Sequence, residues 1–384
     1  MTDLLIVGAG PAGRALAHRG LAHGLSVTVI DPDPDRAWTA TIGAFTDDLP
    51  DWLDDDVIAC AAPQFVVYTP QRRTVDRAYG VFSPTRLQAA LSLAGAVVER
   101  IRVSELGTDR VRLADGRMLR ARHVIDTRGG WSDNPDLPRQ RAYGTVHPRD
   151  AADHSEMVLM DWRETPEAGP SFSYRVALGD GTRLIEETCL AGRPAVLLTE
   201  LARRNELRSP DPKIRVPEEV DFPLYLHRTP WRHTGALQFG AAGGLMHPAT
   251  GYSIAASLAT ADDLAAAIAT GRDPRQVLWP AGARWTHRLR MIGLGVLLTF
   301  RGRELREFFD AFFALPLPTQ RAYLNDRHSV RGTLAAMWAV FRALGWQQRT
   351  RVIRSTVAAV SSASAFRPAA RPVFRRWPSR RRVP

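Results

Sequence analysis

The chain has 384 residues, 45% hydrophobic and 24% charged, so it can form two or three domains and is neither a small binding module nor a largely disordered protein. Its formal net charge of +11 favours an anionic partner, either membrane phospholipid or nucleic acid. The two cysteines, Cys60 and Cys189, lie far apart without metal-ligand spacing, which predicts free thiols in a reducing cytosol and neither a disulfide nor a metal site.

The first thirty residues predict the opening unit of a doubly wound α/β sheet. Residues 3–7 and 26–30 are apolar strand segments, and residues 14–23 between them are helical. The turn after the first strand has the Gly-x-Gly-x-x-Gly pattern of dinucleotide-binding folds and reads Gly8-Ala9-Gly10-Pro11-Ala12-Gly13.

Each glycine of this turn has a mechanical role in binding a pyrophosphate at the start of the helix. Gly8 allows the tight turn, Gly10 lets the backbone approach the phosphates, and Gly13 lets the helix pack closely on the strand. Asp31 follows Gly13 by eighteen residues and ends the second strand, where its carboxylate can bind ribose hydroxyls. This pattern predicts a bound dinucleotide, and both FAD and NAD satisfy it.

A second helix begins at Ser83, which can cap it, and runs to about Leu93 with Pro84 in its first turn. We expect Arg86, in the same turn, to contact the cofactor. Three short strand segments follow, with an Asp-Gly turn between the last two, and they predict a hairpin that returns to the sheet: Val97–Ile101, Arg110–Leu113 and Arg120–Ile125.

Residues 142–230 contain further strand signals, including Ser171–Leu178 and Arg183–Leu190 joined by a Gly-Asp-Gly turn. The chain becomes Ala-rich and helical from Ala255 and stays helical from Val277 to about Ser355. The predicted division is a discontinuous FAD-binding domain (1–50, 80–135 and 235–272), a β-rich substrate domain (51–79 and 136–234), a helical region (273–360) and a loose basic tail (361–384).

Two later segments favour FAD over NAD. The run from Val124 to Gly129, which contains Asp126, resembles the second flavin-contact strand of FAD-dependent oxidoreductases. The run from Leu237 to Gly244 resembles the third flavin segment, in which a strand leads through glycines to a helix whose N-terminus can face the flavin ring. Its glycines are Gly240, Gly243 and Gly244.

Three further segments carry a resemblance to one family. The sequence His247-Pro248-Ala249-Thr250-Gly251-Tyr252-Ser253 resembles a signature of flavin-dependent lycopene β-cyclases. Leu184–Thr188 resembles the FLEET motif of that family, and Met160–Arg163 resembles its MDWR-type motif. With the glycine-rich start, the resemblance covers roughly residues 1–330. The segment Gly240-Ala241 stands where flavin aromatic hydroxylases usually carry Gly-Asp, which weakens a hydroxylase interpretation.

The resemblance implies an α/β fold with a Rossmann-type FAD-binding domain like that of aromatic hydroxylases, a β-rich substrate domain and a C-terminal helical region. It also implies conversion of the acyclic ends of lycopene to β-rings. Reduced FAD would assist without net redox change, and NADPH would be its reductant. His247, Pro248, Thr250, Gly251 and Tyr252 would lie beside the flavin, although a lone histidine before a proline is more often structural.

Lycopene has no polar group, so cyclisation begins with protonation of an end double bond. The proton comes from a carboxylic acid that stays protonated in an apolar cavity. The family motif indicates Glu186 as this proton donor and Glu187 as a supporting residue. Only one of the two can face the cavity, since strand side chains alternate, and periodicity alone does not say which face is inside. We expect Asp161 and Trp162 to line the cavity; a turn aspartate and a core tryptophan are the alternatives.

The longest apolar run, residues 291–300, is too short to cross a bilayer, which needs roughly 20 residues. Core packing is the expected use of most of the four phenylalanines at 308–313. A lipid-dissolved substrate, a basic surface and exposed aromatics still predict a cytoplasmic enzyme on the inner face of a membrane, and the N-terminus carries no export signal. A flavin reductase or monooxygenase acting on another isoprenoid or aromatic compound is the alternative enzyme. Nucleic-acid binding is not expected, because only the arginine excess supports it. Ring type, the number of rings closed and oligomeric state stay open.

Overall fold

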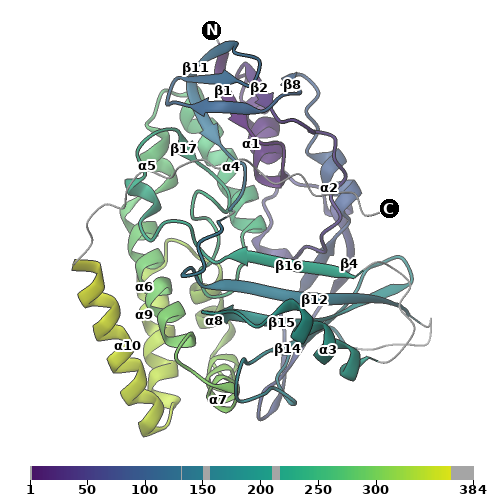
Figure 1. Cartoon of the computed structure of the whole chain (residues 1–384), viewed down its shortest axis with the longest axis vertical. Coiled ribbons are helices and arrows are strands. Elements are labelled where there is room, and N and C mark those ends of the chain that lie inside the picture. Colours follow the sequence, from purple (N-terminus) through teal and green to yellow (C-terminus); the bar gives the residue numbers. More distant parts are fainter. Residues whose placement is uncertain (1, 131, 150–155, 210–216, 365–384) are drawn as a thin grey trace.

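The computed structural model describes residues 2–130, 132–149, 156–209 and 217–364, and it has two main sheets with helices packed beside them (Figure 1). The first sheet contains the predicted opening unit, which is confirmed: β1 (Thr2–Val7), α1 (Pro11–Ala22) and β2 (Val27–Ile30). Its strand order in the described chain is β8-β2-β1-β11-β10-β9, and β17 pairs with the end of β11. The remaining strands of this sheet are β8 (Val97–Glu99), β9 (Val103–Leu106), β10 (Arg110–Leu113), β11 (Met118–Asp126) and β17 (Leu237–Gln238).

Strand β1 is apolar at successive positions because both of its faces are buried. Leu4 and Ile6 belong to the core shared with α1 and α4 (Ile254–Ala269), whereas Leu5 and Val7 belong to a second core beneath strands β10 and β11. Continuous apolar runs are typical of parallel strands covered on both sides. The pairings of β1 with β2 and with β11 are both parallel.

The local predictions for residues 83–126 need three small corrections. Helix α2 (Pro84–Ala90) stops before Leu93, and β8 stops at Glu99. Strand β9 was not predicted, because its four residues carry two polar side chains and give no clear apolar pattern. It pairs antiparallel with β10 and widens the predicted hairpin.

The second sheet lies below the first in Figure 1 and has the order β16-β12-β15-β14-β13-β5-β6 in the described chain. Helix α3 (Leu198–Arg208) packs on β12 and β15. The strands are β5 (Phe65–Tyr68), β6 (Arg72–Val75), β12 (Arg139–Pro148), β13 (Val158–Asp161), β14 (Phe172–Ala177), β15 (Thr182–Gly192) and β16 (Glu218–Pro223). The two predicted strands around the Gly-Asp-Gly turn are thus β14 and β15, and they pair antiparallel.

A small third sheet lies between the two larger ones. It has the order β3-β7-β4, formed by β3 (Gly43–Phe45), β4 (Ile58–Ala62) and β7 (Tyr79–Phe82). Short 3₁₀ helices occur at Thr46–Asp48, Asp55–Val57 and Pro230–Arg232. Since β4 pairs with β7, residues from the two predicted domains share this sheet, and the division at residues 51 and 80 stays a prediction.

The C-terminal helices pack beside the second sheet. Their shared core includes Trp162 and Phe172 from the sheet and Phe309 from the helices. The helices are α5 (Pro274–Leu278), α6 (Ala281–Leu297), α7 (Gly302–Phe313), α8 (Leu317–Leu324), α9 (Val330–Ala343) and α10 (Trp346–Ser364). Helix α10 continues past the predicted start of the tail at 361, since no proline interrupts it, and residues 365–384 lie outside the described part of the chain. Of the helices described, none is long and apolar enough to span a bilayer.

Candidate active site

A cavity of about 2210 Å³ lies between the first sheet and the second sheet, and we refer to it as the large cavity. A pocket for one small organic ligand typically measures roughly 300–1,000 Å³. The large cavity can therefore hold more than one such molecule. At one end it is lined by the glycine-rich turn after β1, and at the other by residues of β14, β15 and β16.

The glycine-rich turn presents an open helix start to the large cavity. Gly8, with a φ of +112°, Gly10, Pro11 and Ala12 all line it, and the start of α1 has no side-chain cap. A Cβ atom placed on Gly10 would meet no atom within 4 Å. The space beside Gly10 is thus available for a ligand, as the sequence predicted.

Gly13 serves packing and does not line the large cavity. A Cβ atom there would lie 2.0 Å from the carbonyl oxygen of Gly8 and 2.6 Å from Oγ1 of Thr127. Only glycine lets α1 approach the ends of β1 and β11 this closely. The separate roles predicted for Gly10 and Gly13 both agree with these contacts.

The two predicted carboxylates at the strand ends line the large cavity. Asp31 accepts hydrogen bonds from the backbone N–H of Ala9 at 2.8 Å and from that of Asp33 at 2.8 Å, which ties it to the glycine-rich turn. Asp126 forms an ion pair with Arg128, with Nε and Oδ1 2.8 Å apart.

The prediction that Arg86 contacts the cofactor is not supported, because its side chain is exposed and donates a hydrogen bond to the carbonyl of Ile58 at 3.1 Å. It does not line the large cavity, because α2 turns Leu87 and Leu91 into the core and Arg86 lies outside that buried face. Arg36 and Arg102 line the large cavity instead. Both lie in connections between elements, where the strand and helix pattern carries no signal for them.

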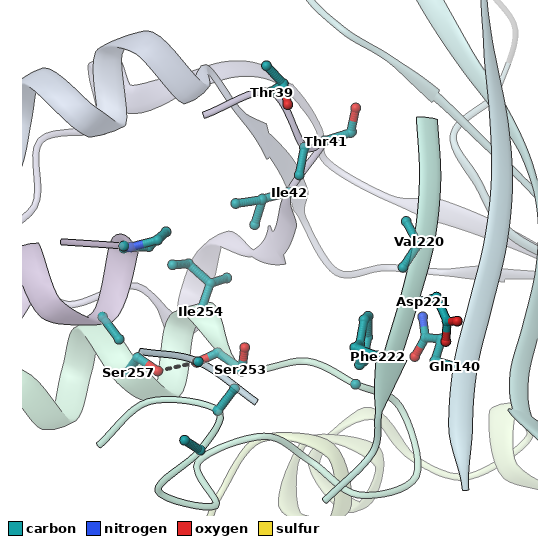
Figure 2. A pocket seen from close by; sticks show the side chains of 18 of the residues that line it. Thr39, Thr41, Ile42, Gln140, Val220, Asp221, Phe222, Ser253, Ile254 and Ser257 are labelled. Carbon is teal, nitrogen blue, oxygen red and sulfur yellow. Dashed lines mark hydrogen bonds between the residues drawn. The ribbon is translucent and has the colours of Figure 1, made fainter. Parts of the chain in front are cut away.

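The third predicted flavin segment lines the large cavity through Gln238, Ala241 and Ala242, and the residues that follow it add to the lining. Thr250, Gly251 and Tyr252 line it, whereas Gly240, Gly243 and Gly244 do not. The residues at the start of α4, Ser253, Ile254 and Ser257, face the loop that carries Thr39, Thr41 and Ile42, and β16 with Val220 and Phe222 borders the same opening (Figure 2).

Two of these glycines bring backbones together. A Cβ atom on Gly240, whose φ is +72°, would lie 2.7 Å from the Cβ of Ala12, and one on Gly243 would lie 2.4 Å from the carbonyl oxygen of Gln238. The glycines thus let this segment pack against the start of α1, and their contact with a cofactor is not seen in the cavity lining.

His247 and Pro248, predicted beside the flavin, line a second cavity of about 340 Å³, which adjoins the large cavity at Tyr252 and Ser253. His247 is 3% exposed; its Nδ1 accepts a hydrogen bond from the N–H of Ala249 at 3.1 Å, and its Nε2 donates to the carbonyl of Tyr323 at 3.3 Å. Burial lowers the pKa of His247 well below its ordinary value, so the ring is neutral. The structural role of this histidine is the one that the contacts support.

Glu186 faces the large cavity. It shares a strand face with Leu184 and Thr188, and all three line the cavity, whereas Ile185 and Glu187 do not. Burial raises the pKa of Glu186 to about 7, opposed by a hydrogen bond that the Thr188 hydroxyl donates at 2.5 Å and reinforced by the charges of Glu218 and Glu187. A substantial fraction of Glu186 is therefore protonated near neutral pH.

Glu187 lies on the opposite face of β15, beneath α3. It is 1% exposed, accepts a hydrogen bond from the Ser171 hydroxyl at 2.5 Å, and forms an ion pair with Arg208, with Nε and Oε2 2.8 Å apart. Burial raises the pKa of Glu187, and Arg208 opposes this rise. Glu187 therefore anchors α3 on the sheet behind the cavity wall.

Three tyrosines surround the Glu186 end of the large cavity: Tyr79 of β7, Tyr174 of β14 and Tyr252 before α4. The hydroxyl oxygens of Tyr79 and Tyr252 are 3.4 Å apart, and Tyr174 lies directly opposite Glu186 in the strand register. Burial raises the pKa of all three phenols well above the ordinary value, so they stay neutral. The sequence analysis identified Tyr252 but not the other two, whose strands are distant in the chain.

The prediction that Asp161 and Trp162 line the large cavity is wrong. Each is 1% exposed. Asp161 pairs with Arg163 at 2.7 Å and with Arg175 at 3.1 Å, and the Trp162 ring packs on Phe172. At the end of β13 the Trp162 side chain enters the core beneath α7, Asp161 is buried by its two arginines, and the preceding Met160 lines the cavity.

Comparison with known proteins places this site in a family. The family model described as "Lycopene cyclase protein" matches residues 3–345. An uncharacterized carotenoid cyclase of Deinococcus radiodurans is 32% identical, with 93% of this chain and 94% of the relative covered. A lycopene beta cyclase of Synechococcus elongatus is 28% identical (89% and 93% covered), and a chloroplastic neoxanthin synthase of Solanum lycopersicum is also 28% identical (86% and 75% covered).

Solved structures agree on the fold. A geranylgeranyl bacteriochlorophyll reductase-like protein from Thermoplasma acidophilum has a TM-score of 0.65 at 15% identity, covering 93% of this chain and 99% of its own. The halogenase PltM in complex with phloroglucinol and FAD has a TM-score of 0.54 at 12% identity, covering 96% and 93%. The mixed α/β fold therefore resembles those of FAD-dependent oxidoreductases and halogenases. Given the match of the family model over most of its length, the chain belongs to the lycopene cyclase family of carotenoid cyclases.

Proposed function

We propose that this carotenoid cyclase converts the acyclic ends of lycopene to β-rings by proton-initiated cyclisation, without net redox change. The observation that carries the proposal is Glu186, a buried carboxyl group that faces the large cavity and whose pKa is raised to about 7. Such a group can hold a proton near neutral pH and donate it to an alkene, which has no hydrogen-bonding group.

The surroundings of Glu186 suit the cation that protonation creates. A proton from its carboxyl group adds to the end double bond, the neighbouring alkene closes the ring, and a second proton leaves. The faces of Tyr79, Tyr174 and Tyr252 are electron-rich and can stabilise positive charge near the reacting end. The hydroxyl groups of the three tyrosines are neutral, so they add no negative charge to this region.

The glycine-rich end of the large cavity fits the ADP half of FAD. Gly10 leaves open space at an uncapped helix start, which favours a pyrophosphate, and Asp31 lies where ribose hydroxyls would be bound. When bound, reduced FAD would supply electron density beside the substrate cation. We infer that NADPH is the reductant that keeps it reduced. Gly251 and Ser253 would hold the end of the cofactor nearest the substrate.

The decisive experiment is chromatography of carotenoids from a lycopene-accumulating host that expresses this chain. We expect β-ring products with the mass of lycopene, and in heavy water each new ring should gain deuterium through the exchangeable acid. A host that expresses Glu186→Gln should retain lycopene. Stoichiometric NADPH oxidation, or a product that differs from lycopene by hydrogen or oxygen, would favour a reductase or monooxygenase instead.

We also propose that the enzyme rests on an anionic membrane surface through α9 and α10. Trp346, Ile353 and Val357 form an outward stripe on α10 and are 79%, 53% and 60% exposed, while Val352 on the opposite face packs into the core. At 100° per residue, Arg349 and Arg354 lie on the two sides of this stripe.

The adjacent helix α9 extends this surface. Trp338 is 61% exposed, and Leu334, one turn earlier, is 49% exposed. Neither α9 nor α10 contains an acidic residue, and together they carry five arginines. Exposed apolar and aromatic side chains bordered by arginines are typical of helices that lie in the headgroup region of a bilayer.

A further inference from the structure

A second carboxyl group faces the large cavity beside Glu186. Gly144 of β12 lies between two antiparallel neighbours and is paired with Glu186 of β15 on one side and with Glu218 of β16 on the other. Directly opposed residues of antiparallel strands project to the same face of a sheet. Glu186 and Glu218 therefore project side by side, about 10 Å apart at their Cα atoms, and both line the large cavity.

Glycine at position 144 keeps the space between the two carboxyl groups open. A Cβ atom at Gly144 would lie 2.8 Å from Cδ1 of Leu184 and 3.5 Å from both Cβ and Cγ of Glu186. A larger residue would displace the Leu184 side chain and stand between the two acids. One cross-strand row of the sheet thus carries two acids with a glycine between them. The row consists of Tyr174, Glu186, Gly144 and Glu218.

The two carboxyl groups differ in that Glu218 has a backbone N–H among its hydrogen-bond partners. Glu218 accepts a hydrogen bond from the backbone N–H of Thr41 at 2.8 Å, and an N–H group can only donate. Burial raises the pKa of Glu218, and its contacts with Thr41 oppose this rise by favouring the ionised carboxylate. The partner of Glu186 is the Thr188 hydroxyl, which can accept from a protonated acid as well as donate. Thr41 faces β16 across the opening of the cavity, near Val220 (Figure 2).

We propose that Glu218 is the carboxylate that accepts the proton released when the ring closes, so that Glu186 and Glu218 form an acid and base pair across Gly144. This inference rests on the proposed cyclisation, and it adds the base to that reaction. Cyclisation needs an acid and a base, and the proton enters at the end double bond but leaves from a different carbon of the new ring. A second carboxylate placed beside the first can therefore serve as the base.

The reaction balances with these two groups. Glu186 gives its proton to the end double bond and becomes a carboxylate, which leaves a tertiary carbocation. The electron pair of the neighbouring alkene forms the new ring bond and moves the charge to the next ring carbon. Glu218 takes a proton from the adjacent ring carbon, whose C–H electron pair becomes the ring double bond. The proton then returns from Glu218 to Glu186, and nothing is oxidised or reduced.

The test is the variant Glu218→Gln in the FAD-loaded enzyme. Single-turnover ring closure should slow by roughly two orders of magnitude, as expected for loss of one acid–base group, and Glu218→Asp should restore part of the rate. The control is Glu105→Gln, which removes one exposed negative charge on β9 and should leave the rate unchanged. Wild-type closure rate and product in Glu218→Gln would overturn the assignment.

A second readout does not depend on catalysis. The infrared carboxyl band of Glu186, identified by its loss in Glu186→Gln, should titrate near pH 7 in the wild-type protein. The charged groups that act on it are Glu218 of β16 and Glu187 of β15, and the tyrosines that face it are neutral. Removing the Glu218 charge should lower the pH at the midpoint of the Glu186 titration.

If the Glu186 carboxyl band titrates with the same midpoint in Glu218→Gln as in the wild-type protein, the proposed acid and base pair is wrong. If the wild-type enzyme forms no ring from lycopene, the proposed function fails, while the infrared titration still decides whether the two carboxyl groups are coupled.

Discussion

At the scale of single residues, neighbouring glutamates on one strand have opposite environments. Glu186 faces the large cavity, and Glu187 is paired with Arg208 under α3 with only 1% of its side chain exposed. Replacing one member of a buried ion pair leaves the other charge without compensation and typically costs roughly 3–5 kcal/mol. We therefore expect Glu187→Gln to lower the free energy of unfolding by about 3 kcal/mol.

This loss can be measured by chemical denaturation of the flavin-free protein. Glu186→Gln provides the matched control, since its side chain borders the cavity and no arginine depends on it. If Glu187→Gln unfolds at the wild-type denaturant concentration but loses cyclisation, Glu187 has a chemical role and not a positioning role.

The pH dependence of cyclisation is also decided at Glu186. Its folded-state pKa lies near 7, above the ordinary value of 4.5, and the protonated form is the proton donor. On the alkaline side, where Glu218 is ionised, the rate of ring closure should therefore fall as pH rises through about 7. A pH series of single-turnover rates measures this limb. A rate that rises through the same range would mean that the ionised form of the residue is the active one.

At the scale of an element, the start of α1 separates binding from packing. Gly10 borders open space, so Gly10→Val should fold with a normal unfolding temperature but lose FAD, because the side chain would occupy the pyrophosphate position. Gly13→Ala should destabilise the fold itself by about 1–3 kcal/mol, because its Cβ would lie 2.0 Å from the Gly8 carbonyl oxygen. Flavin absorbance after desalting and thermal unfolding without flavin measure the two effects. Full flavin content in Gly10→Val would contradict the proposed cofactor site.

At the scale of the whole molecule, the arginine-flanked stripe on α10 determines how the enzyme would meet a lipid surface. Trp346→Ser should weaken sedimentation with vesicles of anionic phospholipid roughly tenfold or more, because a large apolar side chain no longer enters the headgroup region. Leu207→Ser is the matched control, since Leu207 is 73% exposed on α3 and away from this surface. Raised salt should weaken binding as the arginine contacts are screened. Equal loss in both variants would exclude α10 as the docking surface.

The sequence by itself determined the secondary-structure elements that depend on interactions between residues close together in the chain. The structure confirms the predicted strand, glycine-rich turn, helix and second strand at residues 3–31. These elements could be predicted because each glycine of the turn meets a steric requirement near its own position. The strands around the Gly-Asp-Gly turn and the helical character of the C-terminal region were likewise predictable from periodicity. The family motif indicated Glu186.

Only the tertiary structure decided which side chains share the large cavity. Alternation makes the two faces of β15 equivalent until α3 covers the face of Glu187, which leaves Glu186 toward the cavity. Glu218 comes beside Glu186 through strand pairing across Gly144, and the chain positions of the two acids give no hint of this. The burial of Asp161 also depends partly on a neighbouring strand, since Arg175, one of the two arginines that pair with its charge, comes from β14. A strand pattern predicts that a side chain is on one face or the other, but what covers each face depends on elements packed from elsewhere in the chain.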